Sequence, residues 1–511
     1  MIRMVSNRRS VKIRTKKPLN LGTFVFVLAL ILYFALGIFF IIFGQINADE
    51  GWYLYASHLV YEGQKPYQDF AYTQTPFLPY FYGMMQNLWP SGIYLGRITT
   101  FFLSTMAMFL SLNVAWRYAG KKASILTLLL WVTFPLGIYY QSITKTYALV
   151  TLLFMLVFFT LSSEIDRNWK SFFVTIFVLL ATLTRLSALF FAIPILLYAF
   201  MVANNKFRIM IVTFCILSIL WMAFLSFPNL EATKWNLVGH HTGQWGNLSL
   251  YEKLIETLNT RLPVLLITFF TYLLFLITLL IIGYKQIIAC IRENKPILIF
   301  LIALALFTLP HFVSGGFHFE YFVTVLLCIF PVSAIFSVEI YEQNQRFSRV
   351  LLTTILLSTF VLGFFRGGFL FVDMETWRRP VDQVITVAEV VAENSDPDDQ
   401  IYAMEALWIA VEADRYTVPN MSMAQFSFFN GDTAAAKSLN LINGQMTLEF
   451  IMNKVPKLVI LTELDWQILE KTAEFESIVF ALDEKYELLW EEDNFGQLGE
   501  RVQVYLRKRD S

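Results

Sequence analysis

The sequence predicts a polytopic α-helical membrane protein with a C-terminal α/β domain outside the membrane. Of its 511 residues, 57% are hydrophobic, only 15% are charged, and 50 are phenylalanine. Soluble chains of this length are far more polar, so a soluble enzyme is excluded and membrane lipids are expected partners, whereas nucleic acid is not. About eleven apolar runs, most of them long enough to cross a bilayer, alternate with polar segments as far as residue 371.

The charged residues divide the chain into two parts. Residues 1–371 contain 27 Lys and Arg against 13 Asp and Glu, whereas residues 372–511 contain 12 against 26. We therefore expect a basic N-terminus at 1–20, a membrane domain at 21–371 and an acidic soluble domain at 372–511. Cys215, Cys290 and Cys328 lie in or beside apolar runs without metal-ligand spacing, so we expect them to pack in the core.

The apolar runs predict the membrane crossings. The first run, 21–46, follows seven basic residues and lacks a small-residue cleavage site, as an uncleaved signal anchor does. The two short runs that meet near Arg185 leave open a re-entrant hairpin. The later runs lie at about 93–116, 123–141, 145–163, 171–185, 186–203, 209–228, 262–283, 297–313, 320–341 and 350–371.

The basic residues between the runs predict the orientation. With the N-terminus inside, 19 Lys and Arg fall in the N-terminal segment and the cytoplasmic loops, and six fall in the opposite loops. This distribution follows the positive-inside rule. It places Asp49, Glu50 and the C-terminal domain on the extracytoplasmic side of a plasma (cytoplasmic) membrane.

Two external loops, 47–92 and 229–261, are long enough to fold. The first is expected to hold an amphipathic helix from Glu50 to Tyr61 and an aromatic helix from Pro76 to Leu88 along the interface. The C-terminal domain is expected to contain helices at 381–393 and 465–480 and strands at 401–404, 457–461, 487–490 and 502–506. No nucleophile elbow, P-loop, zinc motif or dinucleotide turn occurs in it, so a lid or substrate-guiding cap is its expected role.

The first external loop carries the most informative pattern. Asp49 and Glu50 emerge at the membrane surface just after the first run, where a lipid-borne substrate can reach them. The alternative is structural, because Asp is a favoured N-cap of the helix that follows.

The segment containing Asp49-Glu50 resembles the first external loop of a known enzyme family. The similar residues continue with Tyr53, Ala56, Gly63, Pro66-Tyr67, Asp69 and Pro76. The family is that of the GT-C membrane glycosyltransferases that use polyprenyl-phosphate sugars, above all the branch of protein O-mannosyltransferases and the lipid A aminoarabinose transferase. The segments 183–188 and 315–321, the latter leading to Pro331, are similar to its basic-residue hairpin and its tyrosine-proline segment.

The resemblance spans most of residues 20–371, and it implies a GT-C-like fold and sugar transfer from a polyprenyl-phosphate donor to an acceptor hydroxyl. The chain departs from the pattern at Gln74-Thr75-Pro76, where many relatives place Lys or Asn before a double proline. It also reads Thr144-Lys145-Thr146-Tyr147 where relatives often place a second Asp.

Glycosyl transfer defines the roles expected of these residues. The acceptor hydroxyl loses a proton as it attacks the sugar, and the leaving phosphate needs cations. Asp49 is the expected base of an inverting displacement, with Glu50 in support. The candidates for binding the donor phosphate are Arg185, Tyr321, Lys145, His318 and Arg366, and those for binding the rest of the substrates are Tyr53, Lys65, Tyr72, Gln74, His240, His241 and Glu320.

The sequence leaves several alternatives open. Arg185 and Arg366 could instead be cations near helix ends whose side chains extend to the membrane interface. His240-His241 could instead belong to a loop without a binding role. A divalent cation is a possible cofactor, and the acceptor is a glycan, lipid or protein. The competing function is a lipid-linked sugar flippase or secondary transporter, which predicts charges near mid-membrane. The crossings carry few such charges, and this favours the enzyme.

Overall fold

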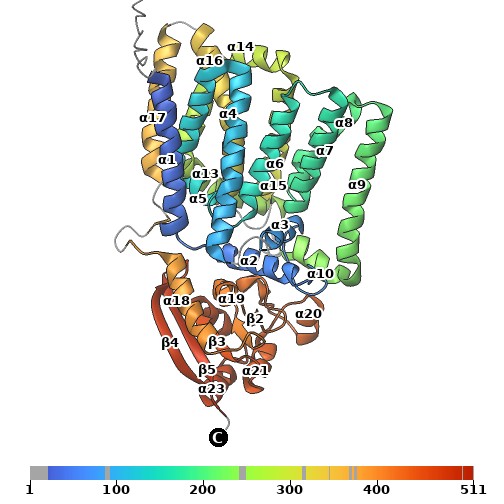
Figure 1. The fold of residues 1–511 in the computed structure, drawn as a ribbon, viewed down its shortest axis with the longest axis vertical. Helices are drawn as coiled ribbons and strands as arrows, with labels where there is room; N and C mark the ends of the chain where they lie inside the picture. Colours follow the sequence, from blue (N-terminus) through green and yellow to red (C-terminus); the bar gives the residue numbers. More distant parts are fainter. Residues whose placement is uncertain are drawn as a thin grey trace, which may run out of the picture.

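The structure, a computed structural model, describes residues 21–86, 92–240, 249–313, 318–343, 346–367, 371–372, 377–497 and 499–509. Upright helices form one body, and a small α/β domain lies beyond one end of them (Figure 1). The first helix begins at the end of the body away from that domain and runs toward it.

The first body consists of helices that coincide with the predicted apolar runs, together with short helices at the end that faces the α/β domain (Figure 1). They are α1 (Leu21–Phe43), α2 (Ala48–Tyr61), α3 (Phe77–Met85), α4 (Ile93–Val132), α5 (Pro135–Tyr140), α6 (Thr146–Leu161), α7 (Arg167–Thr184), α8 (Ala188–Val202), α9 (Asn205–Ser226), α10 (Leu230–Lys234), α12 (Leu250–Glu256), α13 (Leu262–Thr268), α14 (Phe270–Glu293), α15 (Lys295–Val313), α16 (Tyr321–Gln343) and α17 (Arg346–Gly367).

Helix α4 contains two of the predicted crossings. Its backbone leaves the helical region at Ala119 and Gly120, where Gly120 has a φ of 70°, and a second arm follows this break. When the arms are counted separately, each of the eleven apolar runs corresponds to a helix of the described chain. Six of the described helices are long and apolar enough to cross a membrane, and three more apolar helices are shorter.

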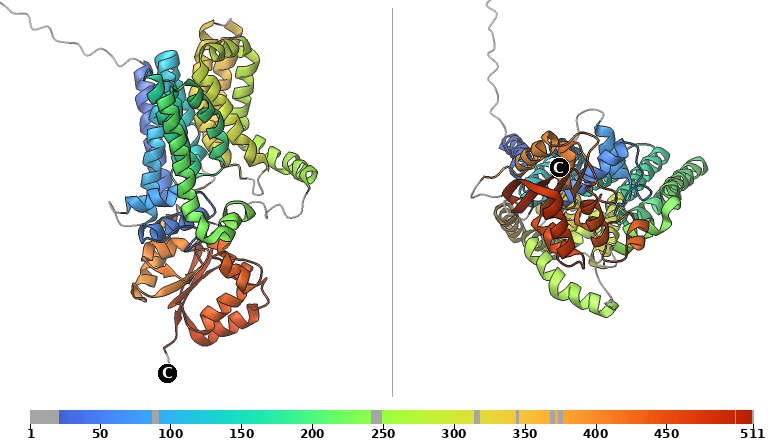
Figure 2. Two further views of the ribbon diagram at one scale, coloured as in Figure 1. Left: turned by 90° about the vertical axis from the view of Figure 1, so that its right-hand side faces the viewer. Right: turned by 90° about the horizontal axis from the view of Figure 1, so that it is seen from below.

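Helices α7 and α8 meet at Arg185 and stand upright beside the other helices (Figure 1). They therefore form an antiparallel pair of ordinary helices rather than the re-entrant hairpin left open above. Helix α9 lies at the edge of the body, and α12 and α13 extend sideways from it (Figure 2).

The first external loop forms the predicted pair of helices across the end of the bundle. Helix α2 begins with a capping box, in which the Asn47 side chain accepts from the helix and Glu50 accepts from the backbone N–H of Asn47. Helix α3 covers the predicted aromatic segment. The second long loop contains α10, α12 and two π-helical turns, Trp235–Gly239 and Thr257–Arg261.

The C-terminal domain is a mixed five-stranded sheet with helices on both faces. The strand order is β2-β1-β3-β5-β4, with β2, β1 and β3 parallel and β5 antiparallel to both of its neighbours. Its elements are α18 (Pro380–Glu393), β1 (Gln400–Ala403), α19 (Leu407–Ala413), β2 (Tyr416–Thr417), α20 (Thr433–Ser438), α21 (Gly444–Met452), β3 (Leu458–Thr462), α22 (Glu463–Leu469), α23 (Phe475–Lys485), β4 (Tyr486–Phe495) and β5 (Glu500–Arg507).

The two faces of the sheet pack against different helices, because alternate side chains of a strand point in opposite directions. Val459 and Leu461 of β3 belong to a core with α21 and α23. Leu458 and Ile460 belong to a second core, which contains α18, α19 and the aromatic residues of α2. The C-terminal domain and the first external loop are therefore joined by one continuous hydrophobic core.

Gly51 shows how close this joint is. A Cβ atom at Gly51 would lie 3.0 Å from the Trp408 side chain, so a larger residue would push Trp408 away by a few tenths of an ångström. The Trp408 indole N–H donates to the carbonyl of Asn47 at 3.0 Å, and the Tyr55 hydroxyl accepts from the backbone N–H of Thr417 at 2.8 Å.

A buried carboxyl pair in the C-terminal domain predicts that its stability depends on pH. Burial, and then the neighbouring Asp465 and Glu500, raise the pKa of Glu405 to about 8, and burial also raises the pKa of Asp465. The folded state therefore binds protons more tightly than the unfolded chain does. The stability that this proton contributes is present near pH 4 and is lost as the pH rises toward 8.

We predict that Glu405→Gln, which mimics the protonated carboxyl, raises the unfolding temperature of the full-length protein relative to wild type progressively between pH 5 and pH 8.5. Thermal unfolding in detergent followed by intrinsic fluorescence measures this difference. Glu449→Gln, at an exposed position on α21, is the control and should give a constant difference. A constant difference for Glu405→Gln would contradict the prediction.

Candidate active site

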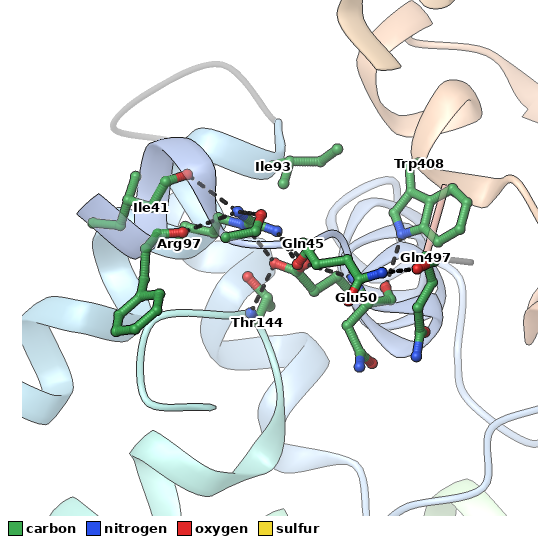
Figure 3. Close-up of polar contacts among 12 residues, drawn as sticks. Ile41, Gln45, Glu50, Ile93, Arg97, Thr144, Trp408 and Gln497 are labelled. Atoms are coloured by element: carbon green, nitrogen blue, oxygen red, sulfur yellow. Dashed lines mark hydrogen bonds and ion pairs between the residues drawn. The ribbon is translucent and has the colours of Figure 1, made fainter. Parts of the chain in front are cut away.

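A buried ion pair holds the end of the first crossing against the start of α4. The Arg97 guanidinium donates to both oxygens of Glu50, from Nε at 2.9 Å and from Nη2 at 2.7 Å, and both side chains are fully buried (Figure 3). The backbone N–H of Thr144 also donates to Glu50, at 3.2 Å. Glu50 thus joins α2, α4 and the 141–145 turn.

The same arginine completes the end of α1. Its Nη1 donates to the carbonyls of Phe40, Ile41 and Gly44 at 3.0–3.3 Å, and its Nη2 donates to Gln45 at 3.2 Å (Figure 3). The last carbonyls of a helix have no partner within the helix, and in a membrane protein leaving them unsatisfied costs several kcal/mol. Arg97 therefore fixes where the first crossing ends and α2 begins.

Next to this pair, Lys145 lies between two carboxylates. Its Nζ is 2.7 Å from Asp49 and 2.6 Å from Glu320, and the Tyr147 hydroxyl donates to Glu320 at 2.8 Å. Burial alone would lower the pKa of Lys145, but Asp49 and Glu320 hold it well above its usual range. Burial would likewise raise the pKa of Glu320, but Lys145 lowers it to about 2. The ion pairs of Lys145 therefore favour the charged forms of Lys145 and Glu320.

The Asp49 carboxylate is held by two donors and faces open space. Lys145 binds one oxygen, and the Trp52 indole N–H donates to the other at 3.0 Å. The Asp49 side chain is still 26% exposed, whereas that of Glu50 is fully buried. Of the two adjacent carboxylates, Asp49 is the one that a substrate can reach.

Arg185 is a buried cation with a different set of neighbours. Its guanidinium donates to the hydroxyls of Thr146 and Ser187 and lies over the rings of Tyr147 and Tyr321, 5.2 and 4.6 Å from their centroids. Within the described part of the chain, no carboxylate lies within ion-pair distance of it, unlike Lys145 and Arg97.

Arg185 forms part of the wall between two adjoining cavities. The polar cavity, about 210 Å³, is lined by residues that include Asp49, Lys145 and Glu320. The apolar cavity, about 190 Å³, is lined by residues that include Leu186 and Phe190. Three residues line both cavities: Thr73, Arg185 and Tyr321.

The structure brings most of the predicted site residues together. Asp49, Tyr53, Lys145, Arg185, His240, His318, Glu320 and Tyr321 line the polar cavity, and Gln74 lines the apolar one.

Other predicted residues lie elsewhere. Tyr72 is fully buried against Trp52, and the Lys65 ammonium lies 5.1 Å from the ring centroid of Phe224, away from both cavities. His241 and the side chain of Arg366 lie outside the described residues.

Several lining residues were not found from the sequence. Tyr147 and His311 line the polar and apolar cavities respectively, and the C-terminal domain contributes Gln425, Phe426 and Gln497 to the polar one. An ionisable residue inside an apolar run is itself a signal, and this signal applies to Arg97 and His311. The glutamines lie in ordinary loops of a soluble domain and carry no such signal.

No protein-family model matches this chain, and no curated protein matches its sequence. Among solved structures, it is similar to ArnT, an aminoarabinose transferase, from Cupriavidus metallidurans in the apo state. The TM-score is 0.60 at 13% identity, and the match covers 94% of this chain and 97% of ArnT. This chain has the GT-C fold.

Two further structures extend the comparison. ArnT bound to undecaprenyl phosphate matches with a TM-score of 0.60 at 12% identity, with the same coverage of 94% and 97%. The oligosaccharyltransferase of Archaeoglobus fulgidus in its apo form has a TM-score of 0.49 at 14% identity, and 96% of this chain is matched to 74% of that one. The match to ArnT over nearly the whole length of both chains confirms the predicted fold class, an α-helical membrane protein with a C-terminal domain.

We predict that Arg97→Met lowers the stability of the protein by about 3–5 kcal/mol, because it leaves the Glu50 carboxylate buried without its cation and removes the Arg97 donor from the carbonyls of Ile41 and Gly44. Thermal unfolding of the purified protein measures the change. Arg501→Met removes an exposed partner of Glu491 and is the control, with an expected change below about 1 kcal/mol. Equal losses in the two variants would contradict a structural role for the Glu50–Arg97 pair.

Proposed function

We propose that this protein is a membrane glycosyltransferase that moves a sugar from a polyprenyl-phosphate donor to an acceptor hydroxyl. The observation that supports this most is the pair of adjoining cavities, one polar and one apolar, with Arg185 in the wall between them. A polyprenyl-phosphate sugar has the same three parts in the same order: a polar sugar, an anionic phosphate and an apolar chain.

In this proposal Arg185 holds the donor phosphate. A guanidinium that lacks a carboxylate partner gains most from an incoming phosphate, with which it forms charge-assisted hydrogen bonds. Tyr321 stacks on Arg185 and keeps it in place, and the first isoprene units lie in the apolar cavity beside Leu186 and Phe190. His311 lines the same cavity.

Asp49 acts as the general base. The acceptor hydroxyl transfers its proton to Asp49 as its oxygen forms a bond with the sugar C1, and the bond from C1 to the phosphate oxygen breaks. Polyprenyl phosphate leaves with that electron pair, and Arg185 stabilises its negative charge. A single displacement of this kind inverts the anomeric centre.

Glu50 has a positioning role in this mechanism. It is fully buried against Arg97 and does not line the polar cavity. We therefore assign to it the placement of α2, and with it the direction in which the adjacent Asp49 points. Of the two predicted catalytic carboxylates, only Asp49 meets the substrate.

Lys145 takes the position between Asp49 and Glu320 in which a divalent cation would neutralise two carboxylates. Among the described residues, no group of three or more His, Cys, Asp or Glu side chains is arranged to hold a metal ion. The proposed mechanism therefore uses the Lys145 ammonium for charge neutralisation. The distribution of basic residues along the sequence supports an extracytoplasmic site, and a plasma membrane is the location that we propose for it.

We predict that Arg185→Ala weakens binding of undecaprenyl phosphate by about 2–5 kcal/mol, because the phosphate loses its partly desolvated partner. Equilibrium binding to the protein in lipid nanodiscs measures this loss. Arg208→Ala, a partly exposed arginine near the start of α9 and outside both cavities, is the control and should bind as wild type does. Unchanged binding in a folded Arg185→Ala protein would remove Arg185 from the phosphate site.

We predict that Asp49→Asn lowers the transfer rate by about 10²- to 10⁴-fold while undecaprenyl phosphate binding is retained, because the amide keeps the shape of the side chain but cannot accept the proton. Product formation from a radiolabelled donor measures the rate. Asp69→Asn, an exposed carboxylate of the same loop, is the control. Full activity in Asp49→Asn would refute the assignment, and loss of folding would assign Asp49 a structural role through its contacts with Lys145 and Trp52.

A further inference from the structure

The roof of the polar cavity belongs to the C-terminal domain and differs chemically from the rest. The membrane domain contributes charged groups, among them Asp49, Lys145 and Arg185. The C-terminal domain contributes Gln425, Phe426 and Gln497, and within the described part of the chain none of its charged side chains lines this cavity. The roof therefore suits a part of the substrate that is polar but uncharged.

Gln425 has an unmet hydrogen-bonding group in this roof. Its Oε1 is buried and accepts no hydrogen bond from the described residues. A buried amide oxygen without a partner costs about 1–3 kcal/mol, and such groups are rare in folded proteins. A ligand hydroxyl would supply the missing bond when the Gln425 side chain turns this oxygen toward the cavity, and the amide group can also donate to a neighbouring hydroxyl.

The backbone that carries Gln425 is held in place. Ala424 is fully buried with a φ of 50°, a left-handed conformation that is unfavourable for alanine and that aims the 3₁₀ turn Ala424–Ser427. The Ser427 hydroxyl accepts from the backbone N–H of Met423 at 2.8 Å, and the Ser422 hydroxyl donates to the carbonyl of Ala71 at 2.9 Å. The turn is thus fixed both to itself and to the first external loop.

An aromatic surface lies next to this amide. The rings of Phe426 and His240 meet edge to face with centroids 5.0 Å apart, and both residues line the cavity. A pyranose ring has an apolar face of C–H groups and an edge of hydroxyls. An aromatic ring beside an amide matches these two features, because the ring buries the apolar face and the amide bonds the hydroxyls.

Gln497 connects the C-terminal part of the cavity lining to the start of α2, next to Asp49. Its side-chain Oε1 accepts from the backbone N–H of Ala48 at 2.7 Å, and its carbonyl accepts from the Gln45 side chain (Figure 3). Ala48 immediately precedes Asp49, so the roof and the carboxylate are held in one frame. A sugar bound under the roof is thereby presented to Asp49.

We propose that Gln425 and Phe426 form a subsite for an uncharged pyranose ring, with Gln425 bonding its hydroxyls and Phe426 packing on its face. This inference rests on the proposed function, because the ring is either the sugar of the donor or a sugar of a glycan acceptor. The subsite makes the C-terminal domain a determinant of sugar specificity rather than only a lid.

The test measures equilibrium binding to full-length protein in nanodiscs with three kinds of probe. The probes are undecaprenyl phosphate, undecaprenyl phosphate carrying glucose or mannose, and methyl glucoside or methyl mannoside added in the presence of undecaprenyl phosphate. The variants are Gln425→Ala and Gln425→Met, the second of which preserves side-chain length if the first fails to fold. Gln445→Ala, at an exposed glutamine of the same domain, is the control.

We expect the Gln425 variants to bind undecaprenyl phosphate within twofold of wild type and to lose roughly three- to tenfold in affinity for a sugar-bearing probe, the effect of one neutral hydrogen bond. A loss confined to the sugar-linked lipids identifies the donor sugar, and a loss confined to the methyl glycosides identifies an acceptor sugar. Either result supports the subsite.

Two results overturn the subsite. The first is that the Gln425 variants and Gln445→Ala have the same affinity for every sugar probe. This result includes the case in which no sugar-bearing probe binds more tightly than the same probe without its sugar. The second is an equal loss for undecaprenyl phosphate and its sugar-linked forms. The proposed function fails separately, if the wild-type protein does not bind undecaprenyl phosphate or Arg185→Ala binds it equally well.

Discussion

The whole site depends on the buried ion pair between Glu50 and Arg97. A charge removed from water is tolerated only when its partner and its remaining hydrogen-bonding groups are supplied, and here six backbone groups supply them. The pair thereby determines three positions at once: the end of α1, the start of α2 and the turn before Lys145. The catalytic chemistry that we propose for Asp49 is possible because its neighbour Glu50 performs this structural task.

Charge neutralisation explains how the polar cavity is arranged. Lys145 satisfies Asp49 and Glu320 together, and this leaves Arg185 as the buried cation whose ordinary counter-ion is missing from the described residues. A site in which every cation had a carboxylate partner would have little free energy to gain from a phosphate. This division between a paired lysine and an unpaired arginine separates the part that would hold the proton acceptor from the part that would bind the donor.

The sequence predicted the features that arise from local patterns. The length of an apolar run and the placement of Lys and Arg are local properties. The eleven helical segments, the helices α2 and α3, and Asp49 as a residue open to a cavity could therefore be predicted. The C-terminal domain was harder to predict. Its predicted helix at 465–480 is two helices, α22 and α23, and the short helices α19, α20 and α21 gave too little periodicity to be seen.

What the sequence left out depends on tertiary contacts. The Arg97 side chain bonds Glu50, which is 47 residues away in sequence, and no local pattern predicts such a pair. Gln425 is an ordinary loop glutamine until the fold turns it into a cavity. Glu50 was expected to support Asp49 at the substrate because the two residues are adjacent in sequence, although adjacent residues of a helix point in different directions and here reach different environments.

The core shared by α2 and the C-terminal domain also has a consequence for how the chain assembles. Trp408 and Asn47 are hydrogen-bonded across 361 residues, so a ribosome completes most of the protein before the partner of the first loop exists. The helices of the membrane domain are made first. The aromatic side of α2, which includes Trp52 and Tyr55, therefore stays uncovered at the membrane surface until the C-terminal domain is made. A chain that ends before Gln497 therefore has its crossings but not the complete lining of the polar cavity.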